Sequence, residues 1–420
     1  MAAQLAVADA CVALASEQEA RAHAEARALS PTPHGRVGLE LEFHLVDLQR
    51  PGRRLEWPEV SGLLARVPVM PGGSRITVEP GGQLELSTLP MPDVRSAVRV
   101  LREDRTALSA ALAASRLGLA SLGTDPARPA QRVNPASRYA AMERHFDAAG
   151  CGTAARAMMC ATAALQINVD AGPASCWSSR MRHLNRLGPV LVAISACSPV
   201  LGGRRTGWRS MRQQVWGQLD QARCGPAPEG TDPRQDWASY AMAAPVMLVR
   251  DPDTGEAVPV TDRVPFLAWL SEERALAGRM PTVADLDYHL STLFPPVRLR
   301  GFVELRCLDA VPDRWWPGLA ALTVTLLDDA VVADGAAEAC EPLAGAWSVA
   351  ARDGLDDPRV ARAARRCVEL AAQRCPVDLR REVEEYAELV TRGRSPGDEV
   401  REQADRHGPL AVLEAAAHAW

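Results

Sequence analysis

The chain has 420 residues, 47% of them hydrophobic, so it can bury a large core, and its net charge is −5. This balance gives no general attraction to nucleic acid or to acidic membranes, and we expect neither as a partner. All 47 basic residues are arginine, because the sequence contains no lysine. The missing lysine excludes a phosphate-binding loop ending in Gly-Lys-Ser/Thr and a Schiff-base mechanism.

The ten cysteines form no C-x-x-C pair, which argues against a zinc ribbon or a redox motif, and we expect free thiols. The first thirty residues lack the basic start and the apolar run of a signal peptide. The longest apolar stretch, around Val190 to Ala196, is too short to span a bilayer. The sequence therefore predicts a soluble, cytoplasmic protein.

Strand and helix patterns alternate along the first three quarters of the chain. A surface helix is expected over residues 3–29, followed by a strand from Val37 to Leu48. The elements predicted next are a strand region over 75–89 that is interrupted at Pro80-Gly81-Gly82, a helix over 94–117, a Gly/Pro-rich loop over 123–135, a helix over 137–146, a strand over 164–170 and mainly helix over 177–216.

The second half contains fewer predicted strands. We expect an exposed loop over 223–234, a hairpin formed by 246–249 and 257–260, and a last strand over 301–309. Everything after Arg314 is predicted to be helical, with breaks at Pro376 and 395–397. This order indicates an α+β fold with a mainly antiparallel sheet. We divide the chain into an N-terminal helix (1–34), a central α+β domain (35–320) and a C-terminal helical extension packed on it (321–420).

Glutamates recur at alternate positions in several of the predicted strands. Because side chains two residues apart in a strand point to the same face, Glu40 and Glu42 share one face. Glu79 comes just before the Pro-Gly-Gly turn of the second strand region. The other polar faces predicted in this way hold Gln83, Glu85 and Ser87; Gln166, Asn168 and Asp170; and Glu304 with Arg306, Arg298 and Arg300.

A sheet with one face in water would show the same alternation, and for any single strand that is the simpler interpretation. Glutamates repeated in several separate strands are less typical of a solvated face. If these strands share one sheet, the carboxylates converge and raise one another's pKa, and a divalent cation such as Mg²⁺ would relieve their repulsion. Carboxylates with arginines nearby suit phosphoryl transfer, which depends on positioning and charge neutralisation.

At these segments the chain resembles the glutamate–cysteine ligase superfamily, in particular its plant-type and bacterial branch. The similarity lies in residues 38–43, 78–87, 165–170 and 294–309, and it covers roughly residues 35–320. The run Gly-Gly-Gln-x-Glu-Leu-Ser and the strand x-x-Glu-Leu-Arg are specific together and weak singly. Residues 134–146, 237–247 and 285–296 are similar to the ligase branch that serves ergothioneine synthesis.

The resemblance implies a curved antiparallel sheet with an active-site funnel on one face, like glutamine synthetase and guanido kinases, which binds ATP and Mg²⁺. One departure lies at 158–162, where plant-type relatives carry an arginine and this chain reads Met-Met-Cys-Ala-Thr. The implied roles are metal ligands for Glu40, Glu42, Glu79, Glu85, Gln166 and Glu304; nucleotide contacts for Arg298, Arg306 and Asn168; substrate contacts for Arg138, Tyr139 and Arg298; and catalysis by Arg306 and Glu304.

The implied reaction joins the γ-carboxylate of glutamate to the amine of cysteine through a γ-glutamyl phosphate. It requires no protein nucleophile, which agrees with a chain that shows no Ser-His-Asp or Cys-His signature. Two other classes stay open: a ligase of the same fold with a different amine acceptor, and a non-ligating metal-dependent hydrolase or inactive relative. The presence of all five glutamates favours activity. His44 is in phase with Glu40 and Glu42, but we expect it to be a hydrogen-bonded structural residue.

Overall fold

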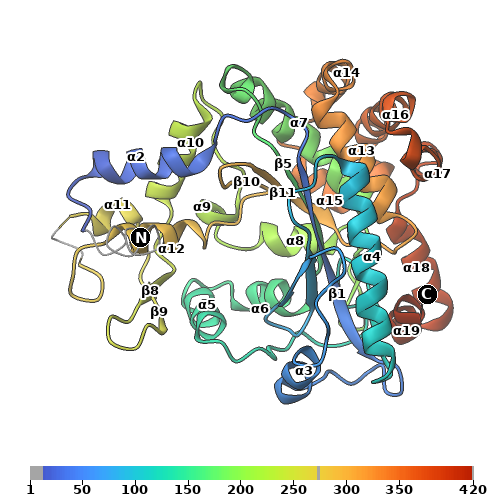
Figure 1. Cartoon of the computed structure of the whole chain (residues 1–420), viewed down its shortest axis with the longest axis horizontal. Coiled ribbons are helices and arrows are strands. Elements are labelled where there is room, and N and C mark those ends of the chain that lie inside the picture. Colours follow the sequence, from blue (N-terminus) through green and yellow to red (C-terminus); the bar gives the residue numbers. More distant parts are fainter. Residues whose placement is uncertain (1–12, 272–274, 419–420) are drawn as a thin grey trace.

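A computed structural model of the chain describes residues 13–271 and 275–418 and is built around one seven-stranded sheet (Figure 1). Every pair of neighbouring strands in this sheet is antiparallel, which confirms the predicted mainly antiparallel α+β fold. The strand order is β10 (Val297–Leu299), β11 (Val303–Asp309), β5 (Ala164–Val169), β1 (Val37–Asp47), β3 (Leu84–Ser87) and β2 (Arg75–Val78), and β4 (Leu117–Ala120) pairs with the second half of β1.

One face of the sheet is apolar and fully covered. Leu39, Leu41 and Phe43 of β1 are completely buried, as alternation along the strand requires. The helices α4 (Val94–Ala113) and α13 (Trp316–Asp328) lie on this side (Figure 1). Burial of these side chains fixes which residues must point to the opposite face.

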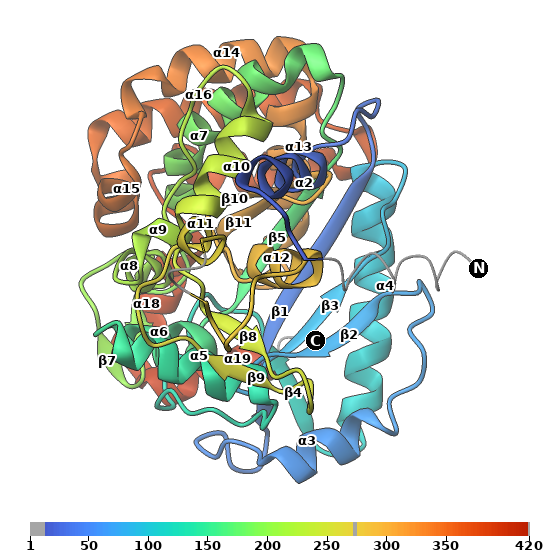
Figure 2. The ribbon, with the colours of Figure 1, turned by 90° about the vertical axis from the view of Figure 1, so that its left-hand side faces the viewer.

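Shorter helices cover the polar face only in part. These are α5 (Ser137–Ala148), α6 (Gly152–Ala161) and α8 (Met211–Gly217), and Figure 2 shows this side turned toward the viewer. The hairpin of β8 (Leu248–Arg250) and β9 (Ala257–Pro259), which confirms the predicted hairpin, packs against α5. The polar face therefore keeps room for a cavity.

Everything after Arg314 that the structure describes is helical or turn, as predicted. Apolar side chains from these helices belong to the same hydrophobic core as the sheet, so the tail packs on the strands. The three-part division of the chain remains a prediction. The helices that follow α13 are α14 (Ala330–Cys340), α15 (Trp347–Asp353), α16 (Pro358–Arg374), α17 (Arg380–Thr391), α18 (Pro396–His407) and α19 (Pro409–His418).

The remaining elements connect these layers. The first predicted helix is observed as α2 (Glu17–Ala28), and residues 3–12 of that prediction lie outside the described part of the chain. None of the described helices combines the length and the apolar character needed to cross a membrane. The other elements are α3 (Trp57–Leu64), α7 (Trp177–Ser195), β6 (Val200–Leu201), β7 (Arg204–Arg205), α9 (Gln221–Cys224), α10 (Pro233–Ala243), α11 (Phe266–Trp269) and α12 (Val283–Leu290).

Two local predictions are wrong. The helix predicted to reach Leu117 ends at Ala113, and the chain turns at Arg116 (φ 54°) into β4, because pairing with β1 overrides an apolar spacing that continues the helical pattern. The segment 223–234 was predicted to be an exposed loop, but Arg223 is fully buried in α9. Its guanidinium donates to the Thr292 and Pro245 carbonyls, and this pairing makes burial of the charge tolerable.

The turn between β2 and β3 needs glycine at both of its glycine positions. Gly82 has φ +85°, and its amide donates to the Glu79 carbonyl (2.9 Å). A Cβ at Gly81 would lie 2.4 Å from the Cys160 carbonyl oxygen, so the turn presses directly on the end of α6. This contact sets the position of Glu79, which enters the turn.

We expect Gly81→Ala to destabilise the protein by about 1–3 kcal/mol, because backbone on both sides must move. Gly62→Ala in α3 is the matched control, since its Cβ meets nothing within 4 Å and alanine favours helix by up to about 1 kcal/mol. Urea unfolding of the two variants measures both effects. Equal stability of the two would contradict the close contact.

Candidate active site

The register of the sheet places the predicted polar residues side by side. Glu42 of β1 lies opposite Glu85 of β3, and Glu40 lies opposite Gln166 of β5. Further along, Glu304 of β11 lies opposite Asn168 and, on its other side, opposite Arg298 of β10. Directly opposed residues of an antiparallel pair have Cβ atoms about 5 Å apart, so these side chains interact.

A cavity of about 280 Å³ opens on this face of the sheet. Glu304 is fully buried and Asn168 faces a neighbouring cavity, so neither lines it. The predicted residues that do line it are Glu40, Glu42, Glu79, Glu85, Gln166, Arg138, Tyr139, Arg298 and Arg306. Side chains from six elements and the β2–β3 turn are therefore gathered at one site.

Each strand-borne carboxylate of the cavity is held by hydrogen bonds that leave part of it open. Glu40 accepts from Asn168 Nδ2 (2.9 Å). Glu42 accepts from Gln166 Nε2 (3.0 Å) and from the Ala164 amide (2.9 Å). Glu85 accepts, on one oxygen, from the hydroxyls of Thr77 (2.7 Å) and Ser87 (2.9 Å).

Burial and mutual repulsion keep several of these carboxyl groups from ionising readily. Burial raises the pKa of Glu40 to about 7, with Glu85 and Glu304 adding to the shift. Burial and the nearby Glu85 also raise the pKa of Glu42 to about 7. The pKa of Glu79 is raised well above its ordinary value by burial and by Glu85. The acids of the cavity thus repel one another, and Arg306 and Arg212 offset this repulsion and their burial only in part.

Glu304 is in the opposite situation. Arg298 donates to both of its oxygens (2.6 and 2.8 Å), and Arg306 Nη1 donates to Oε1 (2.6 Å). Burial would raise the pKa of Glu304, but Arg298 and Arg306 outweigh burial and lower it to about 2. Glu304 is therefore ionised and holds two arginines beside the acids.

Gln166 joins the two halves of the site. Its Oε1 accepts from Arg306 Nη1 (2.5 Å), while its Nε2 donates to Glu42. One amide therefore contacts the arginine side and the acid side together, and these two bonds fix its orientation.

The carboxylates of the cavity are of the chemical type that binds a divalent cation. Carboxylate oxygens are the ligands that Mg²⁺ prefers, and a bound cation would remove the repulsion that raises these pKa values. Among the described residues, no three His, Cys, Asp or Glu side chains are grouped closely enough to hold a metal ion as they stand. Glu40, Glu42, Glu79 and Glu85 line the same cavity, so they would have to draw together around a shared ion.

The predicted substrate residues lie at the cavity wall. Arg138 donates to the Ser291 carbonyl (3.0 Å), and its guanidinium carbon lies 5.0 Å from the centre of the Tyr288 ring. Burial, with Glu79 nearby, raises the pKa of Tyr139, so its phenol stays protonated. His44 is buried, and its Nε2 shares a hydrogen bond with the Leu122 carbonyl (3.1 Å), as predicted for a structural histidine.

Arg212 of α8 lines the same cavity and was missed from the sequence. It is 97% buried, and its Nη2 donates to the Arg306 carbonyl (2.8 Å). Its Nε and Nη1 have no hydrogen-bond partner among the described residues. No sequence signal singles it out among 47 arginines, because only the packing of α8 on β11 brings it here.

A second cavity adjoins the first, and Glu40 lines both. Its volume is about 400 Å³, and its wall includes Ser30, Thr32, Asn168 and Phe302. The Oδ1 atom of Asn168 is buried there without a hydrogen-bond partner among the described residues. The polar face thus offers two cavities that share Glu40 in their walls.

These acids and arginines on an antiparallel sheet belong to a carboxylate–amine ligase. Residues 36–416 match glutamate–cysteine ligase family 2 (GCS2), and the chain is a member of that family. The match confirms the resemblance inferred from the sequence and extends it through the helical tail.

Individual relatives agree with this assignment. The chain is 52% identical over 404 residues to the glutamate–cysteine ligase EgtA of Mycolicibacterium smegmatis, covering 96% of this chain and 95% of the relative. It is 48% identical over 388 residues to EgtA of Mycobacterium tuberculosis (92% and 90% covered). The chloroplastic glutamate–cysteine ligase of Arabidopsis thaliana is 29% identical over 308 residues (72% and 57% covered).

A solved structure shares the fold. It is the glutamate–cysteine ligase of Francisella tularensis in complex with AMP, which superposes with a TM-score of 0.53 at 13% identity and covers 92% of this chain and 88% of that one. At this identity the likeness concerns the fold alone.

The raised pKa of Glu42 predicts a pH-dependent stability in the presence of a chelator. The folded protein keeps this proton up to about pH 7, whereas a carboxyl with the ordinary value of 4.5 loses it earlier. The stability contributed by this group is therefore present below pH 4.5 and is lost as the pH rises through 7.

Glu42→Gln removes this loss. We therefore expect the difference in the free energy of unfolding, variant minus wild type, to rise by up to about 3 kcal/mol from about pH 5 to about pH 8. Urea unfolding at the two pH values measures the difference. A stability difference that does not change with pH would contradict the raised pKa, and excess Mg²⁺ should reduce the difference by stabilising the wild type.

Proposed function

We propose that this protein is an ATP-dependent glutamate–cysteine ligase that forms γ-glutamylcysteine. One observation carries the proposal: Glu40, Glu42, Glu79 and Glu85 line one cavity together with Arg298 and Arg306. The identity to the EgtA ligases over nearly the whole chain supports the same assignment. Such a site offers cation-binding and anion-binding groups together, as a triphosphate with its metal ions requires.

The acids of the cavity would hold Mg²⁺. We assign this role to Glu40, Glu42, Glu79 and Glu85, with Gln166 beside them, in the polar cavity that we interpret as the predicted funnel. When bound, the ions neutralise the phosphate charge of the nucleotide. Glu304 was predicted as a further ligand, but its hydrogen bonds to Arg298 and Arg306 favour a role in orienting those arginines.

Arg306 is suited to meet the phosphoryl group that is transferred. Its Nη1 is fixed by Glu304 and Gln166, while its Nε has no partner among the described residues. A guanidinium held in this way stabilises developing negative charge without having to reorganise. We place the nucleoside end of ATP in the second cavity, where Asn168 keeps an unpartnered acceptor.

The reaction would proceed in two steps. The γ-carboxylate of glutamate attacks the γ-phosphorus of ATP, which releases ADP and leaves γ-glutamyl phosphate. The cysteine amine then attacks the activated carbonyl carbon, loses a proton and releases phosphate. Arg138, Tyr139 and Arg298 on the cavity wall would orient the amino-acid substrates.

The protein's own thiols agree with a mechanism that uses no protein nucleophile. Cys160 and Cys307 are buried near the cavity, and burial raises the pKa of each thiol to about 12. Such thiols stay protonated and unreactive at neutral pH.

The proposal is tested by measuring phosphate release from purified protein with ATP, Mg²⁺ and glutamate while single amines are added. We expect stimulation by cysteine and formation of γ-glutamylcysteine, detected by mass spectrometry. Equal stimulation by another amine would identify a different acceptor. Phosphate release that does not depend on glutamate would overturn the ligase assignment.

Removing one acid should separate catalysis from folding. We expect Glu85→Gln to lower kcat by at least about 100-fold because a charge that holds the cation is lost, and EDTA to abolish turnover of the wild type. Glu103→Gln, on the exposed side of α4 and paired with Arg99, is the matched control and should keep full activity. Near-normal turnover of Glu85→Gln would refute the metal role.

A further inference from the structure

Strand β11 contains an irregularity next to the site. Leu305 lies opposite Ile167 and Leu308 lies opposite Leu165, so three steps along β11 match two steps along β5. Such a bulge reverses the alternation of side chains. Asp309 therefore lies opposite Ala164, on the face that carries Gln166, although uninterrupted alternation from Glu304 would point it into the core.

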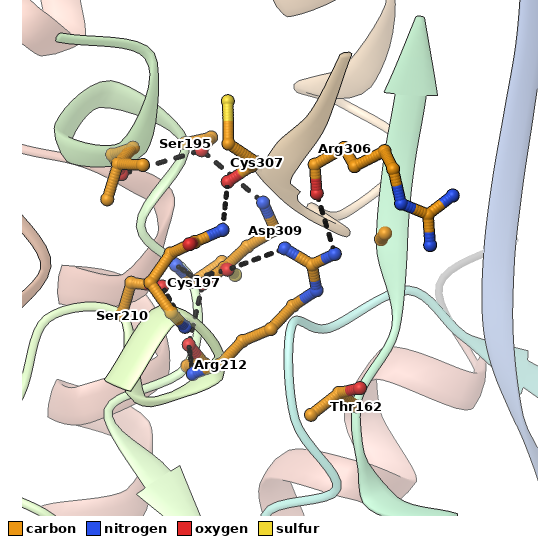
Figure 3. A network of polar contacts seen from close by, with 12 residues as sticks. Thr162, Ser195, Cys197, Ser210, Arg212, Arg306, Cys307 and Asp309 are labelled. Carbon is orange, nitrogen blue, oxygen red and sulfur yellow. Dashed lines mark hydrogen bonds and ion pairs between the residues drawn. The ribbon is translucent and has the colours of Figure 1, made fainter. Parts of the chain in front are cut away.

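The Asp309 carboxylate connects three segments of the chain (Figure 3). Asp309 is 99% buried, and its Oδ2 accepts from the Cys197 amide (2.9 Å) and the Ser198 hydroxyl (2.6 Å). Its Oδ1 accepts from the Ser210 hydroxyl (2.9 Å). One side chain thus ties the end of β11 to the segment after α7 and to the start of α8.

The same hydroxyls orient the first turn of α8. Ser198 Oγ accepts from the Arg212 amide (3.0 Å), and Ser210 Oγ accepts from the Gln213 amide (3.2 Å) as the N-cap. Side chains of this turn then reach back to the bulge, where Arg212 donates to the Arg306 carbonyl (2.8 Å) and Gln213 donates to the Cys307 carbonyl (2.7 Å). Asp309 Oδ1 lies 4.0 Å from Arg212 Nη1.

This arrangement leaves Arg212 fixed but incompletely used. Its backbone and its Nη2 are held, while Nε and Nη1 are buried at the cavity without a hydrogen-bond partner among the described residues, and Nη1 has only the ion pair with Asp309. A buried donor without an acceptor is costly, and because Arg212 lies at the cavity, an oxyanion of a bound ligand would satisfy it.

We propose that Asp309 is a positioning residue of the active site: through Ser198 and Ser210 it holds Arg212 so that the guanidinium donors that make no hydrogen bond within the protein bind an anionic group of a substrate. The group is the carboxylate of the amino acid or a phosphate of the nucleotide. The proposal rests on the proposed function for the identity of these substrates, but the contacts that define it do not depend on that function.

The test compares Asp309→Asn, Arg212→Gln and the double variant. Asparagine keeps the size of the side chain and removes its charge. We expect Asp309→Asn to raise KM for either glutamate or ATP by about 10- to 100-fold, and the substrate affected identifies the anion. Since Asp309 acts through Arg212, the double variant should have the same KM as Arg212→Gln alone.

Asp104→Asn is the structural control. Asp104 is also completely buried and accepts from two backbone amides, those of Gly72 and Ser74, but it lies on α4 behind the sheet. We expect Asp104→Asn to lower Tm without changing the KM for glutamate or for ATP. The proposal would be overturned if Asp309→Asn changed only Tm. It would also be overturned if the KM increases of Asp309→Asn and Arg212→Gln multiplied in the double variant.

Ligand-induced shifts in Tm, measured with glutamate and with ATP–Mg²⁺, make the test independent of turnover. If the wild type bound one of these ligands but did not join glutamate to cysteine, the proposed function would be wrong. Loss of that ligand's Tm shift in Asp309→Asn would still support the positioning role. Shifts of equal size in wild type and variant, or a wild type that neither ligand stabilises, would overturn it.

Discussion

The register of β1 between β3 and β5 is the constraint on which the site depends. It sets Glu42 against Glu85 and Glu40 against Gln166, on the face opposite the buried Leu39 and Leu41. A slip of one residue would turn the leucines into the cavity and the acids into the core, so burial of the apolar face holds the repelling carboxylates together. The hydrophobic effect thereby sustains an arrangement that electrostatics alone would separate.

The environment divides four of the glutamates into two kinds. Glu304 is paired with Arg298 and Arg306 and is ionised, whereas burial raises the pKa of Glu40, Glu42 and Glu79. The result is an acid half that attracts cations beside an arginine half that attracts anions. Gln166 makes a hydrogen bond to each half and lies between them.

Because the chain contains no lysine, every basic Lys/Arg side chain at the site is a guanidinium. A guanidinium presents several donors in one plane, so one arginine can hold a carboxylate or carbonyl and still keep donors for a ligand. Arg306 and Arg212 both show this pattern, each with fixed contacts on some nitrogens and none on others among the described residues. The loop and helix that carry Arg212 are far from β11 in sequence, and they contact it at the bulge and at Asp309.

The sequence by itself determined the strands that carry acids, since apolar and polar residues alternate along β1, β3 and β5 and successive side chains of a strand point to opposite faces. It also indicated the family, because these motifs occur together. The tertiary structure alone decided that the acids share a cavity, that Glu304 is occupied by arginines, and that Arg212 joins the site. Each of these depends on contacts between distant segments, and the bulge in β11 breaks the alternation on which sequence reasoning relies. The same limit explains β4, whose four residues are a strand only because β1 lies beside them.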